Sequence, residues 1–285
     1  MKESSPFSGA LNDACNNPAS HLHSIDPVRP VAPYIGGKRN LAKRVISRIN
    51  ETPHSTYAEV FVGMGGIFLR RDKRPNAEVI NDWSEDVSTF FRVLQHHYIA
   101  FLDMIRFQIS SRANFEKLLA LPASSLTDMQ RAARFLYVQR LSFGGIVNRR
   151  HFGADPSRSS RFDISKLQPM LEAVHERLAP VTIERLRWQD FLRRYDRTGT
   201  LFYLDPPYFE CEGDYGADMF GQREFAEMAD LLTSLKGRFI LSLNDHPKVR
   251  ELFSRFRIEG VETTYQVSGK RPAQSAREVI ISTVA

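Results

Sequence analysis

The stretch Tyr57-Ala-Glu-Val-Phe-Val-Gly-Met-Gly-Gly66 decides the fold, together with the segment that follows it. Its first six residues favour a short buried strand that runs into the glycine-rich turn Gly63-Met-Gly-Gly66. Residues 67–71 are expected to begin a short helix, and Ala77-Glu-Val-Ile80 a second strand that stops at Asn81-Asp82. A strand, a glycine turn, a helix and a second strand in this order open a doubly wound nucleotide-binding sheet. The expected fold class is therefore α/β.

The middle of the chain has the apolar spacing of helices rather than strands. Apolar residues recur at helical intervals over residues 84–121. Thr127-Asp-Met-Gln130 is a capping-box pattern ahead of an amphipathic run over residues 132–141. Glycine, proline and basic residues over residues 143–160 predict a loop or a hairpin, and a further helix is expected over residues 165–178.

Alternation between strand and helix resumes in the last third of the chain. We expect strands over residues 181–186, 201–204 and 238–243, helices over 188–195, 222–236 and 246–253, and a closing antiparallel pair over 257–267 and 278–284. The domain organisation predicted from this order is a flexible tail over residues 1–28 and a sheet domain built from residues 29–85 and 181–285. A helical, arginine-rich insertion over residues 86–180 interrupts that domain.

Composition indicates a folded protein with a basic balance. The formal net charge is +6 and the pI is about 9.4, which suits a partner that carries phosphates. Basic residues gather over residues 29–48, which contain no acidic residue, and over residues 131–161, where Asp155 alone opposes them. No stretch approaches the roughly 20 apolar residues of a membrane helix. The two cysteines, Cys15 and Cys211, have no metal-ligand spacing, so we expect a cytoplasmic protein without a disulfide framework or a metal site.

The string Leu204-Asp-Pro-Pro-Tyr208 follows an expected strand and is the sharpest chemical signal. Ligands bind at this edge of an open α/β sheet. Pro206 and Pro207 remove two N–H donors, so nearby carbonyls meet no competing amide. The Asp205 carboxylate and the Pro206 carbonyl could each accept one hydrogen of a purine amino group and turn its lone pair toward a methyl sulfonium. Tyr208 would stack on that base once it has left the helix.

Two further segments predict a nucleoside site. The glycines of Phe61-Val-Gly-Met-Gly-Gly66 allow close approach of the main chain to a ligand. Asp82 ends the next strand about twenty residues on, where an acidic group accepts ribose hydroxyls. No phosphate-binding Gly-Lys-Ser follows, which favours a nucleoside ligand without a pyrophosphate. Upstream, Pro33-Tyr-Ile-Gly-Gly-Lys-Arg-Asn40 offers a flexible turn, and Lys38 offers a positive group that could reach the amino-acid end of such a ligand.

Together these three segments resemble the DNA adenine methylase family, the Dam-like amino-methyltransferases, over residues 30–285 apart from a weakly matching middle. The family's order is a Gly-Gly-Lys segment, a Phe-x-Gly-x-Gly loop, a target-recognition insertion and then Asp-Pro-Pro-Tyr, and that order holds here. The resemblance implies a Rossmann-like sheet that binds S-adenosylmethionine. It also implies methyl transfer to the N6 amino group of adenine in double-stranded DNA, at a specific short sequence and with the base flipped out.

The resemblance also implies roles for particular residues. It implies a catalytic floor made of Asp205, Pro206, Pro207 and Tyr208. It implies cofactor contacts from Tyr34, Lys38, Phe61, Gly63, Gly65, Asp82 and Asp205. For DNA contacts the candidates are Arg131, Arg134, Arg140, Asn148, Arg149, Arg150, Lys270, Arg271 and Arg277. Leu241-Ser-Leu-Asn-Asp245 resembles the family's later strand-end motif.

One stretch departs from the family. Members carry an Asn-Arg-x-Gly-x-Phe-Asn hairpin, whereas this chain has Asn148-Arg-Arg-His-Phe-Gly-Ala-Asp-Pro156. The recognised DNA sequence is therefore not carried over, and neither is a restriction partner. Other acceptors with a planar amino group stay open: cytosine N4, an RNA base or a glutamine side-chain amide. A protein of another class, a DNA-binding regulator without catalysis, is the remaining alternative. Asp205, Tyr208, Gly63 and Asp82 argue against it because they are intact.

Overall fold

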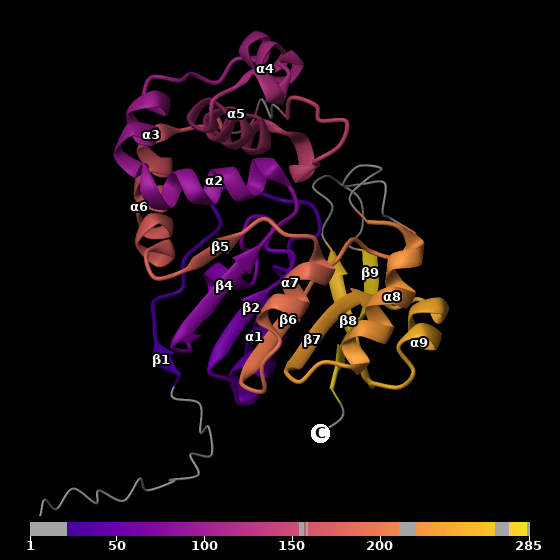
Figure 1. Cartoon of the computed structure of the whole chain (residues 1–285). Coiled ribbons are helices and arrows are strands. Elements are labelled where there is room, and N and C mark those ends of the chain that lie inside the picture. The colour runs from indigo at the N-terminus through magenta and orange to yellow at the C-terminus, as the bar shows by residue number, and fades with distance from the viewer. Residues whose placement is uncertain (1–21, 154–156, 158, 211–219, 266–273, 284–285) are drawn as a thin grey trace, which may run out of the picture.

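The computed structural model describes residues 22–153, 157, 159–210, 220–265 and 274–283. A helical part lies above a twisted sheet, and further helices cover the sheet (Figure 1). The strands are β1 (His23–Ser24), β2 (Thr56–Glu59), β3 (Lys73–Arg74), β4 (Ala77–Asn81), β5 (Thr182–Glu184), β6 (Thr200–Leu204), β7 (Arg238–Asn244), β8 (Arg257–Tyr265) and β9 (Gln274–Ser282).

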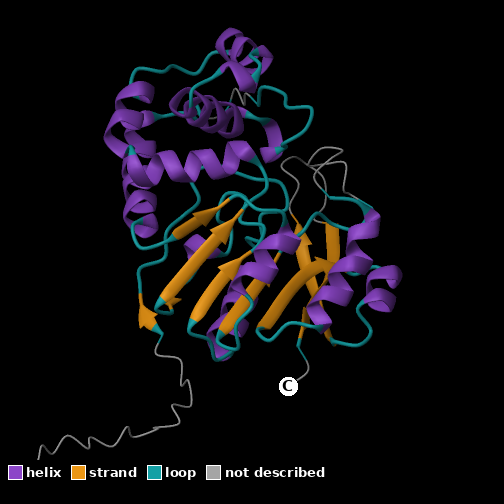
Figure 2. Ribbon diagram, viewed as in Figure 1, coloured by secondary structure: helices purple, strands orange, loops and turns teal. Residues whose placement is uncertain are grey.

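The helices fall into two groups, which the colours of Figure 2 separate from the strands. Those of the upper, helical part are α2 (Glu85–His96), α3 (Tyr98–Ile105), α4 (Arg112–Ala120), α5 (Asp128–Leu141) and α6 (Ile164–Leu178). Those beside the sheet are α1 (Ala42–Glu51), α7 (Trp188–Tyr195), α8 (Gln222–Thr233) and α9 (Pro247–Leu252). Single 3-10 turns occur at Phe68–Arg70, Ala123–Ser125 and Phe143–Gly145.

The predicted doubly wound α/β sheet is confirmed. Seven strands lie in the order β5-β4-β2-β6-β7-β9-β8. The pairs from β5 to β7 are parallel, and β9 inserts antiparallel between β7 and β8. The closing antiparallel pair is therefore also confirmed, and it gives an otherwise parallel sheet an antiparallel edge.

The path of the chain through the sheet shows where a ligand should bind. From β2 the chain moves outward to β4 and β5, and it then returns to β6 on the other side of β2 before continuing to β7. The order therefore reverses between β2 and β6. In open α/β sheets the ligand lies at such a switch point, beyond the carboxyl ends of the strands. Glu59 ends β2 and Leu204 ends β6, so the glycine turn and Asp205 both leave the sheet at this point.

Each face of the sheet has its own apolar core, because successive strand residues point to opposite sides. Tyr57 belongs to the core shared with α2, α5 and α6, whereas its neighbour Ala58 belongs to the core under α7, α8 and α9. The helical part thus packs on the sheet through a continuous core. That residues 86–180 form a separate target-recognition insertion stays a prediction.

The helical part follows its local sequence signals closely. The capping box is confirmed: Thr127 Oγ1 accepts a bond from Gln130 N at 3.3 Å, and Gln130 Oε1 accepts one from Thr127 N at 3.0 Å. Asp163 caps α6 with its side chain alone, with Oδ1 accepting from Ser165 N at 3.1 Å. Satisfied N–H groups at both helix starts fix where these helices begin.

Two local predictions differ from the structure. The helix expected after the glycine turn is a single 3-10 turn, Phe68–Arg70, because Arg71 already has extended dihedrals (φ −66°, ψ 139°) and leads into β3. His23 pairs with Arg74 between β1 and β3, so regular structure begins before the boundary expected at residue 28. Among the described helices, none has both the length and the apolar character needed to cross a bilayer.

Candidate active site

A cavity of about 370 Å³ lies where β2, β4 and β6 end. It brings together segments that are far apart in the sequence: the loop over residues 30–39, the glycine turn, the residues after β4, and the start of the Asp-Pro-Pro-Tyr string. The predicted site residues that line it are Tyr34, Lys38, Phe61, Gly63, Asp82, Asp205, Pro207 and Arg140, the last of these a DNA-contact candidate. Gly65, Pro206 and Tyr208 are not among the lining residues, and Tyr208 joins the site through its contact with Lys38.

Lys38 connects the first predicted segment to the catalytic string. Its side chain is 1% exposed, and its Nζ lies 2.8 Å from Asp205 Oδ1 and 3.6 Å from Glu278 Oε2. Nζ also donates to the Tyr208 hydroxyl at 2.6 Å and lies 4.1 Å from the centre of that ring. A buried ammonium needs such partners. Lys38 therefore holds Asp205 and Tyr208 together at the wall of the cavity, and the contact with the cofactor predicted for it stays a prediction.

Asp205 is held by one of its two carboxylate oxygens. Oδ1 accepts from Lys38 and, at 3.1 Å, from Ser242 Oγ, which lies 2.8 Å from the Tyr203 hydroxyl. Among the described residues no donor bonds to Oδ2. The side chain is 18% exposed, so Oδ2 remains available to a ligand. Burial raises the pKa of Asp205, and the Lys38 ammonium opposes that rise.

The motif at residues 241–245 supports the catalytic string from the neighbouring strand. Ser242 bonds to Asp205, as described above. Asn244 clamps the main chain just after Tyr208, because its Oδ1 accepts from Phe209 N at 2.9 Å and its Nδ2 donates to Phe209 O at 3.1 Å. A side-chain amide can satisfy an N–H and a C=O in this way at one residue. Its geometry thus fixes the path of the chain after the two prolines.

The glycine turn depends on two left-handed residues. Gly63 has φ +51° and Gly65 has φ +76°, a region that L side chains rarely adopt. A Cβ on Gly63 would lie 3.1 Å from the Tyr34 ring, which lines the cavity. A Cβ on Gly65 would lie 2.7 Å from Leu69 Cγ, which belongs to the buried core. Gly63 therefore permits close approach at the cavity, whereas Gly65 is required by the turn itself.

Asp82 closes the turn from the end of β4. Its Oδ2 accepts from Gly63 N at 2.8 Å and its Oδ1 from Ser84 N at 2.9 Å. Burial raises the pKa of Asp82 to about 6. An ionised carboxylate has about four acceptor positions, so two remain for a ligand. The acidic group therefore lies where the sequence predicted, and it also fixes the glycine turn.

Several lining residues were not predicted from the sequence, and Glu59 and Trp83 are the two whose side chains bear most on the chemistry. Glu59 ends β2 and is 2% exposed; burial raises its pKa to about 8. Trp83 follows Asp82, and the guanidiniums of Arg185 and Arg187 lie 5.4 and 4.9 Å from its ring centre. The available signals were an acidic residue inside an apolar strand and an aromatic residue directly after the strand-ending aspartate.

Three arginines of the helical part have inward contacts instead of a free surface. Arg131 is 8% exposed and its Nη2 donates to Ala123 O at 2.8 Å. Arg134 Nε donates to Leu118 O at 2.7 Å, near the end of α4. Arg140 Nε and Nη1 donate to the carbonyls of Arg161 and Val31, both at 2.6 Å. DNA contacts by Arg131, Arg134 and Arg140 stay predictions, and these bonds favour structural roles.

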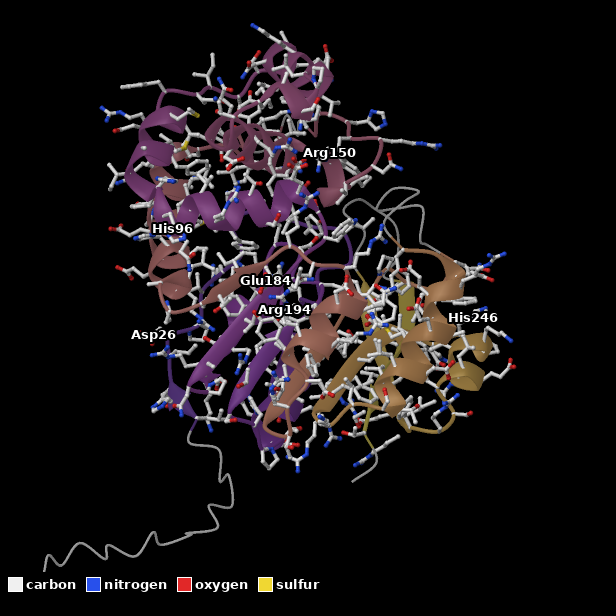
Figure 3. The ribbon with its side chains drawn as sticks, in the orientation of Figure 1. Asp26, His96, Arg150, Glu184, Arg194 and His246 are labelled. Atoms are coloured by element: carbon white, nitrogen blue, oxygen red, sulfur yellow. The ribbon has the colours of Figure 1, made fainter. Side chains whose placement is uncertain are left out.

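The basic stretch after α5 forms the expected hairpin-like loop. Phe143 N donates to His151 O at 2.9 Å, and Asn148 and Arg149 are exposed at its tip, with Arg149 at φ 52°. Arg150 is half-buried, its guanidinium 5.9 Å from the Phe135 ring, and Figure 3 shows it within the helical part. The two adjacent arginines thus differ in exposure.

The remaining candidates for DNA contacts lie near the C-terminus of the chain. Arg277 is an exposed residue of β9, and its carbonyl accepts a bond from Asp245 N at 2.9 Å. Lys270 and Arg271 lie outside the described residues. The roles predicted for all three stay predictions.

The fold and the cavity define the class of the protein. A doubly wound sheet carries a glycine turn after β2, an acidic residue after β4 and an Asp-Pro-Pro-Tyr string after β6, which together match the Rossmann-like amino-methyltransferase expected from the sequence. The sequence pattern of the D12 class N6 adenine-specific DNA methyltransferases matches residues 34–267. The chain belongs to this family, whose members use S-adenosylmethionine to methylate adenine in DNA.

The chain is also similar to individual proteins over most of its length. The chain is 20% identical over 252 residues to type II methyltransferase M.CviBI of Paramecium bursaria Chlorella virus NC1A, covering 88% of this chain and 94% of the relative. It is 24% identical over 276 residues to type II methyltransferase M1.LlaDCHI of Lactococcus lactis subsp. cremoris, covering 90% and 95%. Among solved structures, a putative RNA methyltransferase from Pyrococcus horikoshii is 8% identical with a TM-score of 0.39, covering 85% of this chain and 82% of that one.

The residues around the cavity fit S-adenosylmethionine chemically. Asp82 and Glu59 supply acceptors for hydroxyl or cationic groups, Trp83 supplies an aromatic face, and Gly63 leaves room at the main chain. A volume of about 370 Å³ lies within the range of sites for small organic ligands.

Proposed function

We propose that the cavity holds the cofactor against Asp82 and the glycine turn, with the target adenine entering at Asp205. The observation that carries this proposal is the state of the Asp205 carboxylate. Lys38 and Ser242 fix Oδ1, and Oδ2 is left to accept one hydrogen of an amino group. A fixed acceptor costs no reorganisation when the amino nitrogen reacts, so its contribution falls mainly on the rate of transfer.

The other residues of the string position the base. The Pro206 carbonyl accepts the second hydrogen of the amino group, which turns the nitrogen lone pair toward the cofactor. Tyr208 is half-exposed and stacks on the flipped adenine, while Lys38 fixes its hydroxyl. S-adenosylmethionine supplies an activated methyl group on a sulfonium. The chain's own task is therefore to orient the nitrogen and exclude water.

The proton that leaves the nitrogen has a nearby acceptor. Burial raises the pKa of Asp205, which makes its carboxylate a better base than an exposed aspartate. Oδ2 takes the proton in this scheme, and the Lys38 ammonium keeps Oδ1 in place throughout. Water then removes the proton when the product leaves.

The hairpin-like loop is the proposed DNA-reading element of the helical part. Asn148 and Arg149 are exposed at its tip and can reach base edges or phosphates. The relatives M.CviBI and M1.LlaDCHI are described as type II methyltransferases. We place this chain in the same setting, as the modifying enzyme of a restriction system whose nuclease partner recognises the same DNA site.

Base flipping provides a direct test of the site. The recognised sequence is first found by mapping methylated bases in DNA from cells that express the chain. Duplexes with 2-aminopurine at the target position then report flipping by fluorescence. The proposal expects a fluorescence rise with the wild-type protein and a smaller rise with Tyr208→Ala, whose stacking ring is lost. Equal rises at the target and at a neighbouring position would contradict it.

A further inference from the structure

A chain of buried polar side chains begins at the cavity and leads away from it. Tyr57 and Glu59 lie two residues apart on β2 and therefore share one face of the sheet. The Tyr57 hydroxyl donates to Glu59 Oε2 at 2.5 Å. Tyr57 is 0% exposed and Glu59 is 2% exposed, yet Glu59 lines the cavity and Tyr57 does not. The bond to Glu59 therefore connects Tyr57 to the cavity wall.

Behind Tyr57 the chain continues through Arg71 and Glu78. The guanidinium of Arg71 lies 3.8 Å from the centre of the Tyr57 ring. Arg71 Nη1 donates to Glu78 Oε1 at 2.7 Å, and Glu78 is the register partner of Tyr57 on β4. Arg71 is fully buried, so this contact and the cation–π contact carry more weight than they would in water.

The far end of the chain lies in the helical part. Arg177, in the last turn of α6, donates to Glu78 Oε2 at 2.6 Å and to Glu78 Oε1 at 2.7 Å. Such a bidentate pair fixes orientation as well as distance. The guanidinium of Arg177 also lies 4.1 Å from the centre of the Phe68 ring, in the 3-10 turn after the glycine loop. Contacts between side chains therefore run without a break from α6 to Glu59.

We propose that Tyr57 is a positioning residue for the methyl-transfer site. Its hydroxyl orients the Glu59 carboxyl at the cavity wall, and the Arg71–Glu78–Arg177 network fixes the Tyr57 ring relative to the helical part. The proposal rests on the proposed function, because it takes the cavity to be the cofactor site. It adds a residue outside that cavity, which acts on cofactor binding solely through Glu59.

The charges around Glu59 give the proposal a pH signature. Burial raises the pKa of Glu59 to about 8, and the bond from Tyr57 and the charge of Arg71 oppose that rise, whereas Asp205 and Glu78 add to it. The pKa of Tyr57 is itself raised well above its usual value by burial, so Tyr57 stays a donor. The cofactor carries a positive sulfonium, so it favours ionised Glu59, and its affinity should rise as the pH rises through about 8.

The test is a double-mutant cycle with Tyr57→Phe and Glu59→Gln. Phenylalanine keeps the ring on which Arg71 packs and removes the hydroxyl alone. The dissociation constant of S-adenosylmethionine is measured by calorimetry for the wild type, both single variants and the double variant, and thermal unfolding midpoints confirm folding. Tyr195→Phe is the matched control, because the Tyr195 hydroxyl donates to Glu184 at 2.6 Å, and Glu184 (Figure 3) does not line the cavity.

We expect Tyr57→Phe to weaken cofactor binding about tenfold at pH 7.5, the size of one lost charge-assisted bond. The same change should have no effect in the Glu59→Gln background, and Tyr195→Phe should bind as the wild type does. The pH at which affinity rises should move upward in Tyr57→Phe, because the variant lacks a bond that favours the ionised carboxyl. In Glu59→Gln the step near pH 8 should disappear.

The possible failures are distinguishable. Weaker binding in Glu59→Gln with wild-type binding in Tyr57→Phe overturns the positioning role and leaves the proposed cofactor site standing. An equal loss from Tyr57→Phe with and without Glu59 also overturns it, because Tyr57 then acts by another route. Wild-type affinity in Glu59→Gln contradicts the placement of the cofactor, and the positioning role falls with it. If Tyr57→Phe does not fold, the pH profiles of the wild type and Glu59→Gln decide, and profiles without a difference near pH 8 overturn the proposal.

Discussion

Replacing Asp205 by Asn removes the charge of the proposed acceptor and keeps its shape. The charge has a structural partner as well as a chemical task, because Lys38 Nζ lies 2.8 Å from Oδ1 and is 1% exposed. At an effective dielectric constant of about 20 that pair has a gross attraction of about 6 kcal/mol. Removing one partner of a buried pair typically costs about 3–5 kcal/mol net. Glu278 remains 3.6 Å from Nζ, so we expect a loss of unfolding free energy near the lower end of that range.

The chemical loss is separable from the structural one. Removing one preorganised polar contact from a transition state costs about a hundredfold or more in rate. Asp205→Asn and Asp205→Ala should therefore lose at least about that factor in single-turnover methylation, with S-adenosylmethionine affinity less affected. Urea unfolding gives the stability term, and calorimetry gives cofactor binding.

A matched control is Asp196→Asn, which removes a charge that accepts bonds from Lys236 N and Gly237 N, both at 2.9 Å, away from the cavity. That variant should methylate at the wild-type rate. A folded Asp205→Asn protein that also methylates at nearly the wild-type rate would refute the role assigned to Asp205.

Three other predictions separate the roles of neighbouring residues. Gly65→Ala should cost roughly 1–3 kcal/mol of unfolding free energy, because its Cβ would lie 2.7 Å from Leu69 and its φ is +76°. Gly66→Ala should fold normally, because its Cβ would meet nothing nearer than 3.7 Å, and it should bind the cofactor more weakly, because Gly66 lines the cavity. Urea unfolding measures the stability of both variants, and calorimetry measures their affinity for the cofactor. Equal stability of Gly65→Ala and Gly66→Ala would contradict this prediction. Arg149→Ala should either weaken binding to all DNA sequences and reduce its salt dependence, or reduce the specificity at one base pair by roughly 1–3 kcal/mol. Replacing the half-buried Arg150 should instead lower the stability of the protein more than replacing Arg149 does. Binding is measured to DNA sites with single-base changes at two salt concentrations, and wild-type binding of Arg149→Ala to all of them would contradict the prediction. The pKa of Glu59 in the folded protein is raised to about 8, so folding favours the protonated form of this side chain. The contribution of protonated Glu59 to the free energy of unfolding is complete below the pKa that Glu59 has in the unfolded chain, and it is lost as the pH rises through 8. Glutamine does not ionise, so the unfolding free energy of Glu59→Gln relative to the wild type should increase between pH 5 and pH 9. A difference in unfolding free energy, measured with urea, that stays constant over this range would contradict a buried Glu59 that titrates.

The strand pattern and the strand-end motifs made most of the fold predictable. Strand, glycine turn and second strand over residues 57–82 implied a doubly wound sheet, and motif residues at the ends of β2, β4 and β6 had to meet because parallel strands end at one edge. Local signals such as the capping box at Thr127 also carry over directly, since they depend on neighbours in the chain.

The contacts that the sequence did not predict share a physical cause: partners distant in the sequence decide the environment of a charge. Arg131 and Arg134 look like surface cations in the sequence, but carbonyls at the ends of other helical segments accept their bonds. Glu59 looks like an ordinary strand residue until the fold buries it beside Tyr57 and the cavity. Lys38 lines the cavity, where its contact with the cofactor stays a prediction, but its ion pair with Asp205 could not be foreseen from residues so far apart in the sequence.

The identity of the methylated atom is the most direct test of the central claim. Purified protein is incubated with S-adenosylmethionine and double-stranded DNA, the DNA is digested to nucleosides, and methylated products are identified by mass spectrometry. We expect N6-methyldeoxyadenosine with the wild type, a loss of at least about a hundredfold in its rate of formation with Asp205→Ala, and a wild-type rate with Asp196→Asn. N4-methyldeoxycytidine as the product, or undiminished N6-methyldeoxyadenosine with Asp205→Ala, would contradict it.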